Sequence, residues 1–199
     1  MQDELFNFRK NALMGVLADP LCEEYKTAWA KAKDDKAALV ALSLRQQAIP
    51  YFATHCAQKK GVSRKYLLSN FDKYINGYTF RDCDGVEGYT YGLYAGVEPQ
   101  EEITAEQDVA HLMWCVGTTV IVPQTKCPHI YVSNHCKVQI VCEGYNSVML
   151  SIFDNSLVTV EDSDAETTVT AFLYGGKARA EQGKYFLGKL KQHQKELRL

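Results

Sequence analysis

A repeated pair of apolar residues between positions 118 and 181 limits the fold of this chain more than any other feature. One residue separates the two members of each pair, which is the periodicity of a β-strand with one buried face. The first members of successive pairs lie 8 to 11 residues apart. The spacing therefore predicts short strands separated by tight corners. The pairs are Val120/Val122, Ile130/Val132, Val138/Ile140, Val148/Leu150, Val158/Val160, Val169/Ala171 and Ala178/Ala180.

Turn-forming residues fill the gaps between these pairs. Two architectures fit a strand and a corner repeated at this interval. One is a β-solenoid, in which each unit stacks on the equivalent unit one turn later, and the other is an antiparallel meander or sandwich of hairpins. The near-constant step of about 10 residues favours a short β-solenoid over residues 118–183. The corner groups are Gly144-Tyr145-Asn146-Ser147, Asp154-Asn155-Ser156, Asp162-Ser163-Asp164 and Gly175-Gly176.

The first part of the chain shows helical periodicity in place of alternation. Ser63 is a suitable N-cap for a helix whose apolar stripe includes Tyr66 and Phe71. Asn76-Gly77 then ends the helical part, because these residues readily adopt the left-handed backbone that terminates helices. Residues 1–77 are therefore predicted to form a small helical bundle, and the whole chain is predicted to be an α+β protein.

Two further regions flank the predicted β-repeat. Residues 78–117 are rich in Tyr, Gly and acidic side chains, and they are interpreted as an acidic connecting region. Within this region, Thr104 is a suitable cap for a short helix that ends near Cys115. Residues 184–199 carry five basic residues and one acidic residue, and we expect them to form a basic C-terminal helix or tail.

Charge and cysteine usage limit the environment of the protein. The net charge of −2 gives no strong attraction to nucleic acid or to a membrane. The first ten residues lack the apolar segment of a signal peptide, and no apolar run approaches the length of a membrane span. The seven cysteines contain no CxxC pair, so we expect reduced thiols and a cytoplasmic location. For a phage-encoded protein, this would be the cytoplasm of the host cell.

One cluster of residues could bind a metal ion. Cys127, His129, His135 and Cys136 lie within ten residues of one another, and thiolates and imidazoles are the usual ligands of zinc. Their spacing matches no standard zinc knuckle, and strand alternation would point Cys136 into the core as a small apolar residue. The sequence therefore predicts no cofactor, with zinc at these four residues as the alternative.

Two clusters of acidic residues are candidates for a binding surface. The first lies in a DxDG string, which also occurs in calcium loops, but Leu93 stands where such a loop requires a glutamate. We therefore interpret both clusters as surface that could bind a basic region of a partner. The residues are Asp82, Asp84 and Glu87 in the first cluster and Asp162, Asp164 and Glu166 in the second.

Part of the chain resembles a class of uncharacterised proteins. The segment Asp154–Val160 reads DNSLVTV, and with Tyr145–Val148 and Val169–Ala171 it is similar to short-period DNS-x-V-T repeats in proteins of bacteriophages and bacterial mobile elements. The helical half, including the segment 41–56, also resembles small phage or gut-bacterial proteins. This resemblance implies a helical head and a β-repeat tail, and it assigns no activity to any residue.

The leading interpretation is a non-enzymatic protein-interaction module, because a rigid β-coil would offer a flat, extended surface. Acidic side chains that imitate the charge of DNA would suit an inhibitor of a host defence or nucleic-acid enzyme. One alternative is a small hydrolase with a Cys/His or an acidic site. Another is a structural virion or assembly component, which would form homo-oligomers through open strand edges. A protein partner is expected, whereas nucleic acid and membrane are not.

Overall fold

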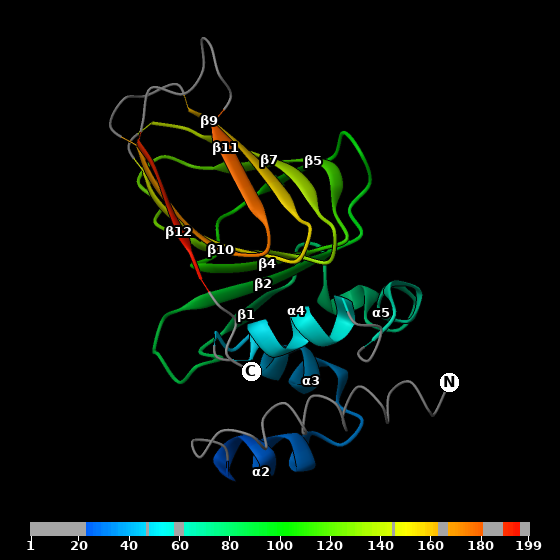
Figure 1. The fold of residues 1–199 in the computed structure, drawn as a ribbon. Coiled ribbons are helices and arrows are strands. Elements are labelled where there is room, and N and C mark those ends of the chain that lie inside the picture. Colours follow the sequence, from blue (N-terminus) through cyan, green and yellow to red (C-terminus); the bar gives the residue numbers. More distant parts are fainter. Residues whose placement is uncertain are drawn as a thin grey trace.

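The computed structural model describes residues 23–46, 48–57, 62–144, 146–162, 167–180 and 189–195. Short helices form a layer at one side of a coil of β-strands (Figure 1). We call residues 23–74 of the described chain the helical head and the strands from β2 onward the coil.

The coil consists of two facing sheets. The chain alternates between them, and neighbouring strands are parallel except for the antiparallel pair β1 and β2. This arrangement is a parallel β-solenoid, so the solenoid prediction is confirmed and the meander or sandwich is excluded. In the described chain, sheet A has the strand order β1 (Thr79–Arg81), β2 (Thr90–Ala95), β4 (Val109–Met113), β6 (His129–Ser133), β8 (Ser147–Phe153), β10 (Thr168–Tyr174) and β12 (Lys189–Gln194). Sheet B has the order β11 (Lys177–Ala180), β9 (Leu157–Asp162), β7 (Lys137–Cys142), β5 (Val116–Val122) and β3 (Glu102–Thr104).

The register of the strands explains the spacing in the sequence. Val109 pairs with His129 and His129 pairs with Met149, so residues 20 positions apart stack on each other. The sequence step of about 10 residues is therefore half of one coil, a strand from one sheet and its corner. The apolar pairs from Val120 to Ala171 are buried between the sheets, as their alternation predicts.

The corners that follow the strands of sheet A share one backbone conformation. Trp114, Asn134, Asp154 and Gly175 all have positive φ angles, which turn the chain sharply toward sheet B. Asn, Asp and Gly tolerate this conformation, which accounts for their place in the sequence repeat.

Small residues stack inside these corners. The N–H of Cys115 donates to Sγ of Cys136 at 3.2 Å, and the N–H of Cys136 donates to Oγ of Ser156 at 3.1 Å. Gly176 occupies the next level, where an added Cβ would lie 2.2 Å from Cγ2 of Ile152. Cys115 and Cys136 are therefore buried parts of the corner stack.

The coil begins earlier in the chain than the sequence analysis expected. The region 78–117 contains strands of both sheets, so it is the first part of the coil and not a connection. The predicted helix from Thr104 to Cys115 is wrong, because β4 forms there and pairs with β2 and β6. All five residues of β4 are buried, which removes the polar alternation that marks a strand.

The C-terminal region also differs from expectation. Lys189–Gln194 forms β12, which pairs in parallel with β10, where a basic helix or tail was expected. Leu190 packs against the apolar core of the coil while its neighbours are exposed. Backbone pairing with β10 therefore outweighs the weak helical pattern of these residues. Residues 184–188 and 196–199 lie outside the described residues.

The helical head is helical as predicted, but its elements are short. Asp35 and Ser63 cap α3 and α5 by accepting backbone N–H groups at 3.1 and 3.2 Å. None of the described helices is long and apolar enough to cross a membrane. The helices are α2 (Glu23–Ala32), α3 (Lys36–Ser43), α4 (Ile49–Ala57), α5 (Arg64–Asn70) and the 3-10 helix η2 (Asp72–Tyr74).

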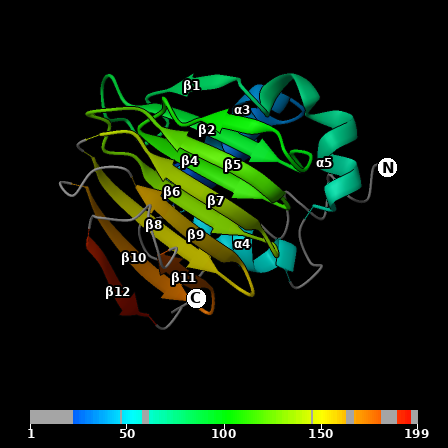
Figure 2. The same cartoon turned by 90° about the horizontal axis from the view of Figure 1, so that it is seen from above.

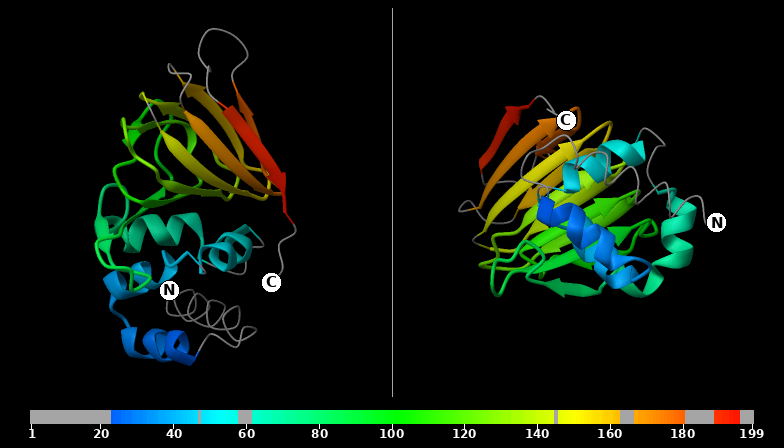
Figure 3. Two further views of the ribbon diagram at one scale, coloured as in Figure 1. Left: turned by 90° about the vertical axis from the view of Figure 1, so that its left-hand side faces the viewer. Right: turned by 90° about the horizontal axis from the view of Figure 1, so that it is seen from below.

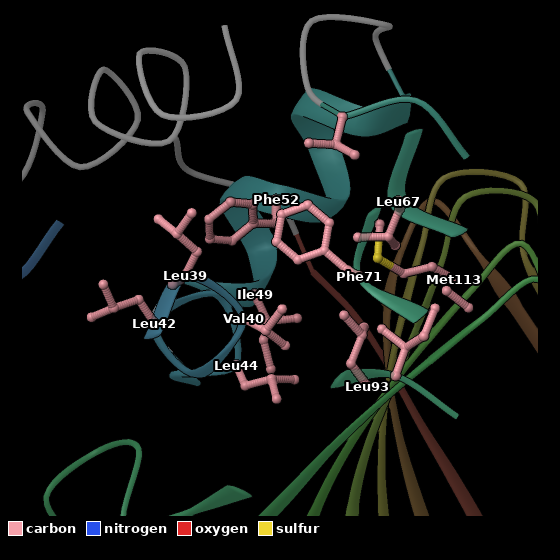
Figure 4. Packing of buried hydrophobic residues seen from close by; sticks show 14 of the residues in the cluster. Leu39, Val40, Leu42, Leu44, Ile49, Phe52, Leu67, Phe71, Leu93 and Met113 are labelled. Atoms are coloured by element: carbon pink, nitrogen blue, oxygen red, sulfur yellow. The ribbon is translucent and has the colours of Figure 1, made fainter. Parts of the chain in front are cut away.

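These helices do not form a separate bundle, because part of the head packs on sheet A. α4 and α5 lie against that sheet, whereas α2 lies farther from it and packs on α3 (Figure 3). Phe52 and Phe71 of the head share a core with Leu93 and Met113 of sheet A (Figure 4). The prediction of a helical N-terminal part is thus confirmed for the described residues, whereas an independent bundle is not what the packing shows.

Candidate functional site

The four candidate metal ligands are separated by a strand. Cys127 precedes β6 and is exposed, whereas His135 and Cys136 follow the other end of β6. A five-residue strand is about 16 Å long at 3.3 Å per residue. His129 is the first residue of β6, at the same end as Cys127, and is half-buried. Within the described chain, no three His, Cys, Asp or Glu side chains gather closely enough to hold a metal ion. The structure therefore does not bring these four residues together.

A buried polar relay joins the coil to the helical head. Nε2 of His111 lies 2.9 Å from Oγ of Ser133, and Oγ of Ser133 donates to Oδ1 of Asn134 at 2.7 Å. Nδ2 of Asn134 then donates to the carbonyl oxygen of Ala53 in α4 at 3.3 Å. The relay therefore connects β4 and β6 to helix α4.

The direction of this relay is unsuited to catalysis by Ser133. A serine hydroxyl has a single proton, and Ser133 donates it to Asn134. His111 must therefore donate to Ser133, whereas a general base would accept the proton of the serine. Burial also lowers the pKa of His111 to about 3. The residue is only 2% exposed, and Ser133 is fully buried.

A small, partly open pocket adjoins His111. The pocket has a volume of about 20 Å³, which is enough for one water molecule. Its wall is mainly apolar and includes Phe52, Phe71 and Leu93 as well as His111. A pocket of this volume has no room for a substrate beside His111.

A second histidine and serine pair repeats this geometry one coil further on. Nε2 of His129 lies 3.0 Å from Oγ of Ser151, and the imidazole stacks on the ring of Tyr131 at 4.0 Å. Nδ1 of His129 is buried and has no hydrogen-bond partner in the described part of the chain. Burial lowers the pKa of His129 to about 4, so the ring is neutral near pH 7.

The first acidic cluster has divided roles. Asp84 is half-buried, and its carboxylate accepts the N–H of Gln46 at 3.1 and 3.2 Å and the hydroxyl of Tyr91 at 3.1 Å. Burial, followed by the Asp84 charge, raises the pKa of Tyr91. Asp82 is exposed and accepts the N–H of Gly88 at 2.8 Å. Asp84 therefore fastens the head to the coil.

The remaining acidic candidates lie in two different places. Glu87 is exposed in the turn between β1 and β2. The backbone of Asp162 ends β9 and pairs with Cys142. Asp164 and Glu166 lie outside the described residues. Of the six predicted acidic binding residues, Asp82 and Glu87 are thus the described side chains that face solvent.

The outer face of sheet B is a surface that the described helices leave open. In the view from above, its strands face the reader and no described helix lies over them (Figure 2). Its outward side chains fall into stacked rows, one residue per strand. One row is Thr119, Gln139, Thr159 and Arg179, and another is Lys137, Leu157 and Lys177.

An open groove crosses this face. Its volume is about 310 Å³, and it runs across β5, β7, β9 and β11. Nε of Arg179 donates to Oγ1 of Thr159 at 3.1 Å along its floor. The groove can hold an extended chain against a rigid sheet, because each strand is fixed by backbone hydrogen bonds to its neighbours. It is lined by Gly117, Thr118, Lys137, Val138, Gln139, Leu157, Thr159 and Arg179.

The groove residues were not predicted from the sequence. They include the polar residues that alternate with the buried apolar residues of each strand, and only the apolar residues of these strands were used to predict the fold. Once the coil period of 20 is known, Gln139, Thr159 and Arg179 are recognisable as a single row.

The described residues form a parallel β-solenoid with helices over the outer face of one sheet and an open groove on the outer face of the other. No protein-family model, curated protein or solved structure matches the chain.

Proposed function

We propose that this chain is a non-enzymatic protein-interaction module whose binding surface is the outer face of sheet B. The observation that carries this proposal is the open groove across four parallel strands, on the face that the described helices do not cover. A sheet held by a parallel ladder changes little in shape on binding, which lowers the ordering cost of association.

The distribution of polar groups supports a binding role over a catalytic one. The histidines best placed to act on a serine, His111 and His129, hold neutral rings in hydrogen bonds to serines of neighbouring strands in sheet A. Among the described residues that line the groove there is no histidine, cysteine or carboxylate. A hydrolase would need such groups at an accessible surface.

The same proposal includes an origin in a bacteriophage or mobile element, with a target protein of the host. The DNS-x-V-T repeat resemblance is the basis for that origin, and Asp82 and Glu87 provide a second, acidic surface on the exposed turn. An inhibitor of a host enzyme would use the groove for affinity and this turn for orientation.

The experiment is affinity capture from bacterial lysate treated with nuclease, using the wild-type chain and one variant that blocks the face. Thr159→Trp places a bulky ring in the groove without changing the charge. The matched control is Thr27→Trp, at an exposed position of α2 in the head. The proposal predicts one nuclease-resistant partner for wild type and for Thr27→Trp, and its loss for Thr159→Trp. Equal capture by all three proteins would contradict it.

A further inference from the structure

Three cations gather at one end of the open face of sheet B. Lys137 and Lys177 lie in the same row, on either side of Leu157, and Arg179 follows Lys177 by two residues on the same strand. All three side chains are exposed. We call Lys137, Lys177 and Arg179 the cationic cluster.

The spacing of the cationic cluster follows from the geometry of the sheet. Adjacent strands are about 4.8 Å apart, so Lys137 and Lys177, two strands apart, are separated by about 10 Å at their backbones. Lys177 and Arg179 are about 7 Å apart along β11, because each residue advances about 3.3 Å. Alternate residues of any extended peptide have the same spacing of about 7 Å.

We propose that the groove binds an extended segment of a partner protein in which aspartate or glutamate occupies alternate positions. This inference rests on the proposed function, and it specifies the chemistry of the partner. Carboxylates two residues apart, in a segment that lies parallel to β11, would meet Lys177 and Arg179. Lys137, about 10 Å to the side, adds positive charge at the same end of the face. The half-buried Leu157 lies between the two lysines and provides an apolar contact for the aliphatic part of the segment.

The charge around the cluster favours a short acidic protein segment over a nucleic acid. Glu102 on β3 lies in the row that continues through Thr119, and Glu161 lies at the far end of β9. A long polyanion that crosses the face would approach these carboxylates, whereas a segment of a few residues does not. None of the described residues that line the groove is aromatic, and single-stranded nucleic acids are usually bound by base stacking on aromatic rings.

The test uses fluorescence anisotropy of a labelled eight-residue peptide of alternating glutamate and serine, added to the full chain. Two comparison probes are the same peptide with glutamine for glutamate and an oligothymidine of equal length. The protein variant combines Lys137→Glu, Lys177→Glu and Arg179→Glu. Its matched control makes the same charge change in the head, at the exposed residues Lys31, Lys65 and Lys73.

The inference predicts that the glutamate peptide binds at least about tenfold more tightly than the glutamine peptide, because charged contacts set specificity. Reversal of the cationic cluster weakens that binding by at least about tenfold, whereas reversal in the head changes it by less than about threefold. Circular dichroism and thermal unfolding confirm that both variants are folded before binding is compared.

Three results would overturn the inference. Equal binding of both peptides, or equal binding by wild type and the cluster variant, would exclude an acidic segment at this groove. Tighter, cluster-dependent binding of oligothymidine would replace the protein segment with nucleic acid. If Thr159→Trp abolishes partner capture and the cluster variant does not, the proposed function holds and only the acidic partner is wrong. If neither variant affects capture, the proposed function itself fails.

Discussion

The two buried histidines make the stability of this protein depend on pH above the range in which carboxylates titrate. Burial lowers the pKa of His111 to about 3 and that of His129 to about 4, from an ordinary value of 6.5. In the unfolded chain both rings regain the ordinary value. Below pH 6.5 the unfolded state therefore binds protons that the folded state does not bind. The contribution of the two neutral rings to the free energy of unfolding is therefore fully present above pH 6.5. It is lost as the pH decreases toward 4 for His129 and toward 3 for His111.

The magnitude follows from the difference between pH and the unfolded pKa. At pH 5 each ring favours the unfolded state by about 2 kcal/mol, since one pH unit corresponds to about 1.4 kcal/mol. The two rings together lower the free energy of unfolding by about 4 kcal/mol relative to pH 7.5. Domains of this kind are stable by only about 5–15 kcal/mol, so the effect is large.

Urea unfolding followed by circular dichroism at pH 7.5, 6.0 and 5.0 measures this dependence. His111→Gln and His129→Gln each remove one titrating ring, so each variant should show about half of the wild-type decrease between pH 7.5 and 5.0. The control is His135→Gln, because His135 is exposed and its ring stays in water in both states. This control should retain the full wild-type decrease.

Two outcomes would refute the reasoning. A wild-type free energy of unfolding that is unchanged between pH 7.5 and 5.0 would mean that the rings are not buried and neutral. The two substitutions His111→Gln and His129→Gln can also be combined in one protein. If the free energy of unfolding of that double variant still decreases between pH 7.5 and 5.0 as in wild type, other groups cause the effect. Loss of stability at pH 7.5 in the variants would not affect the comparison, which uses the change with pH for each protein.

Three other predictions concern the fold. Asp84→Ala should lower the free energy of unfolding by about 1–3 kcal/mol, because the half-buried N–H of Gln46 loses its acceptor. Glu87→Ala, at an exposed position nearby, should change the free energy of unfolding by less than about 0.5 kcal/mol. Equal effects of the two variants in urea unfolding would contradict this. Gly176→Ala should lower the melting temperature by several degrees, because the added Cβ meets Ile152, and an unchanged melting curve would disprove the tight corner. Replacement of both Lys189 and Lys191 by Val should promote self-association measured by sedimentation velocity, because lysines on an edge strand oppose pairing with further strands; a monomeric variant would argue against that role.

The sequence predicts the middle of the coil well because of a simple physical pattern. In β5, β7 and β10 one face lies in the core and the other is at least partly exposed, so the alternation is visible. In β6 and β8 most of the second face is buried as well, but Tyr131, Ser133 and Ser151 still separate the apolar residues in the sequence. In β4 this signal disappears because the head covers the outer face and all five residues are buried. In β12 it disappears because Leu190 is the one residue that packs against the core, among exposed polar neighbours.

The polar contacts were harder to predict because they connect distant residues. Asp84 accepts from Gln46, which lies 38 positions away, and no local pattern marks that pair. The two histidine and serine pairs are each separated by 22 positions, which is one coil of 20 plus two residues along a strand. This relation becomes recognisable only when the coil period is known. The groove likewise depends on residues from four strands that meet only after coiling.

The most direct test of the binding face is carbene footprinting of the captured complex, read residue by residue by mass spectrometry. The account predicts that labelling of Gln139, Leu157 and Thr159 decreases when the partner is bound. It also predicts unchanged labelling of the exposed residues Lys65 and Asp72 of the head. Protection of the head with no change at Gln139, Leu157 and Thr159 would contradict the assignment of sheet B as the binding surface.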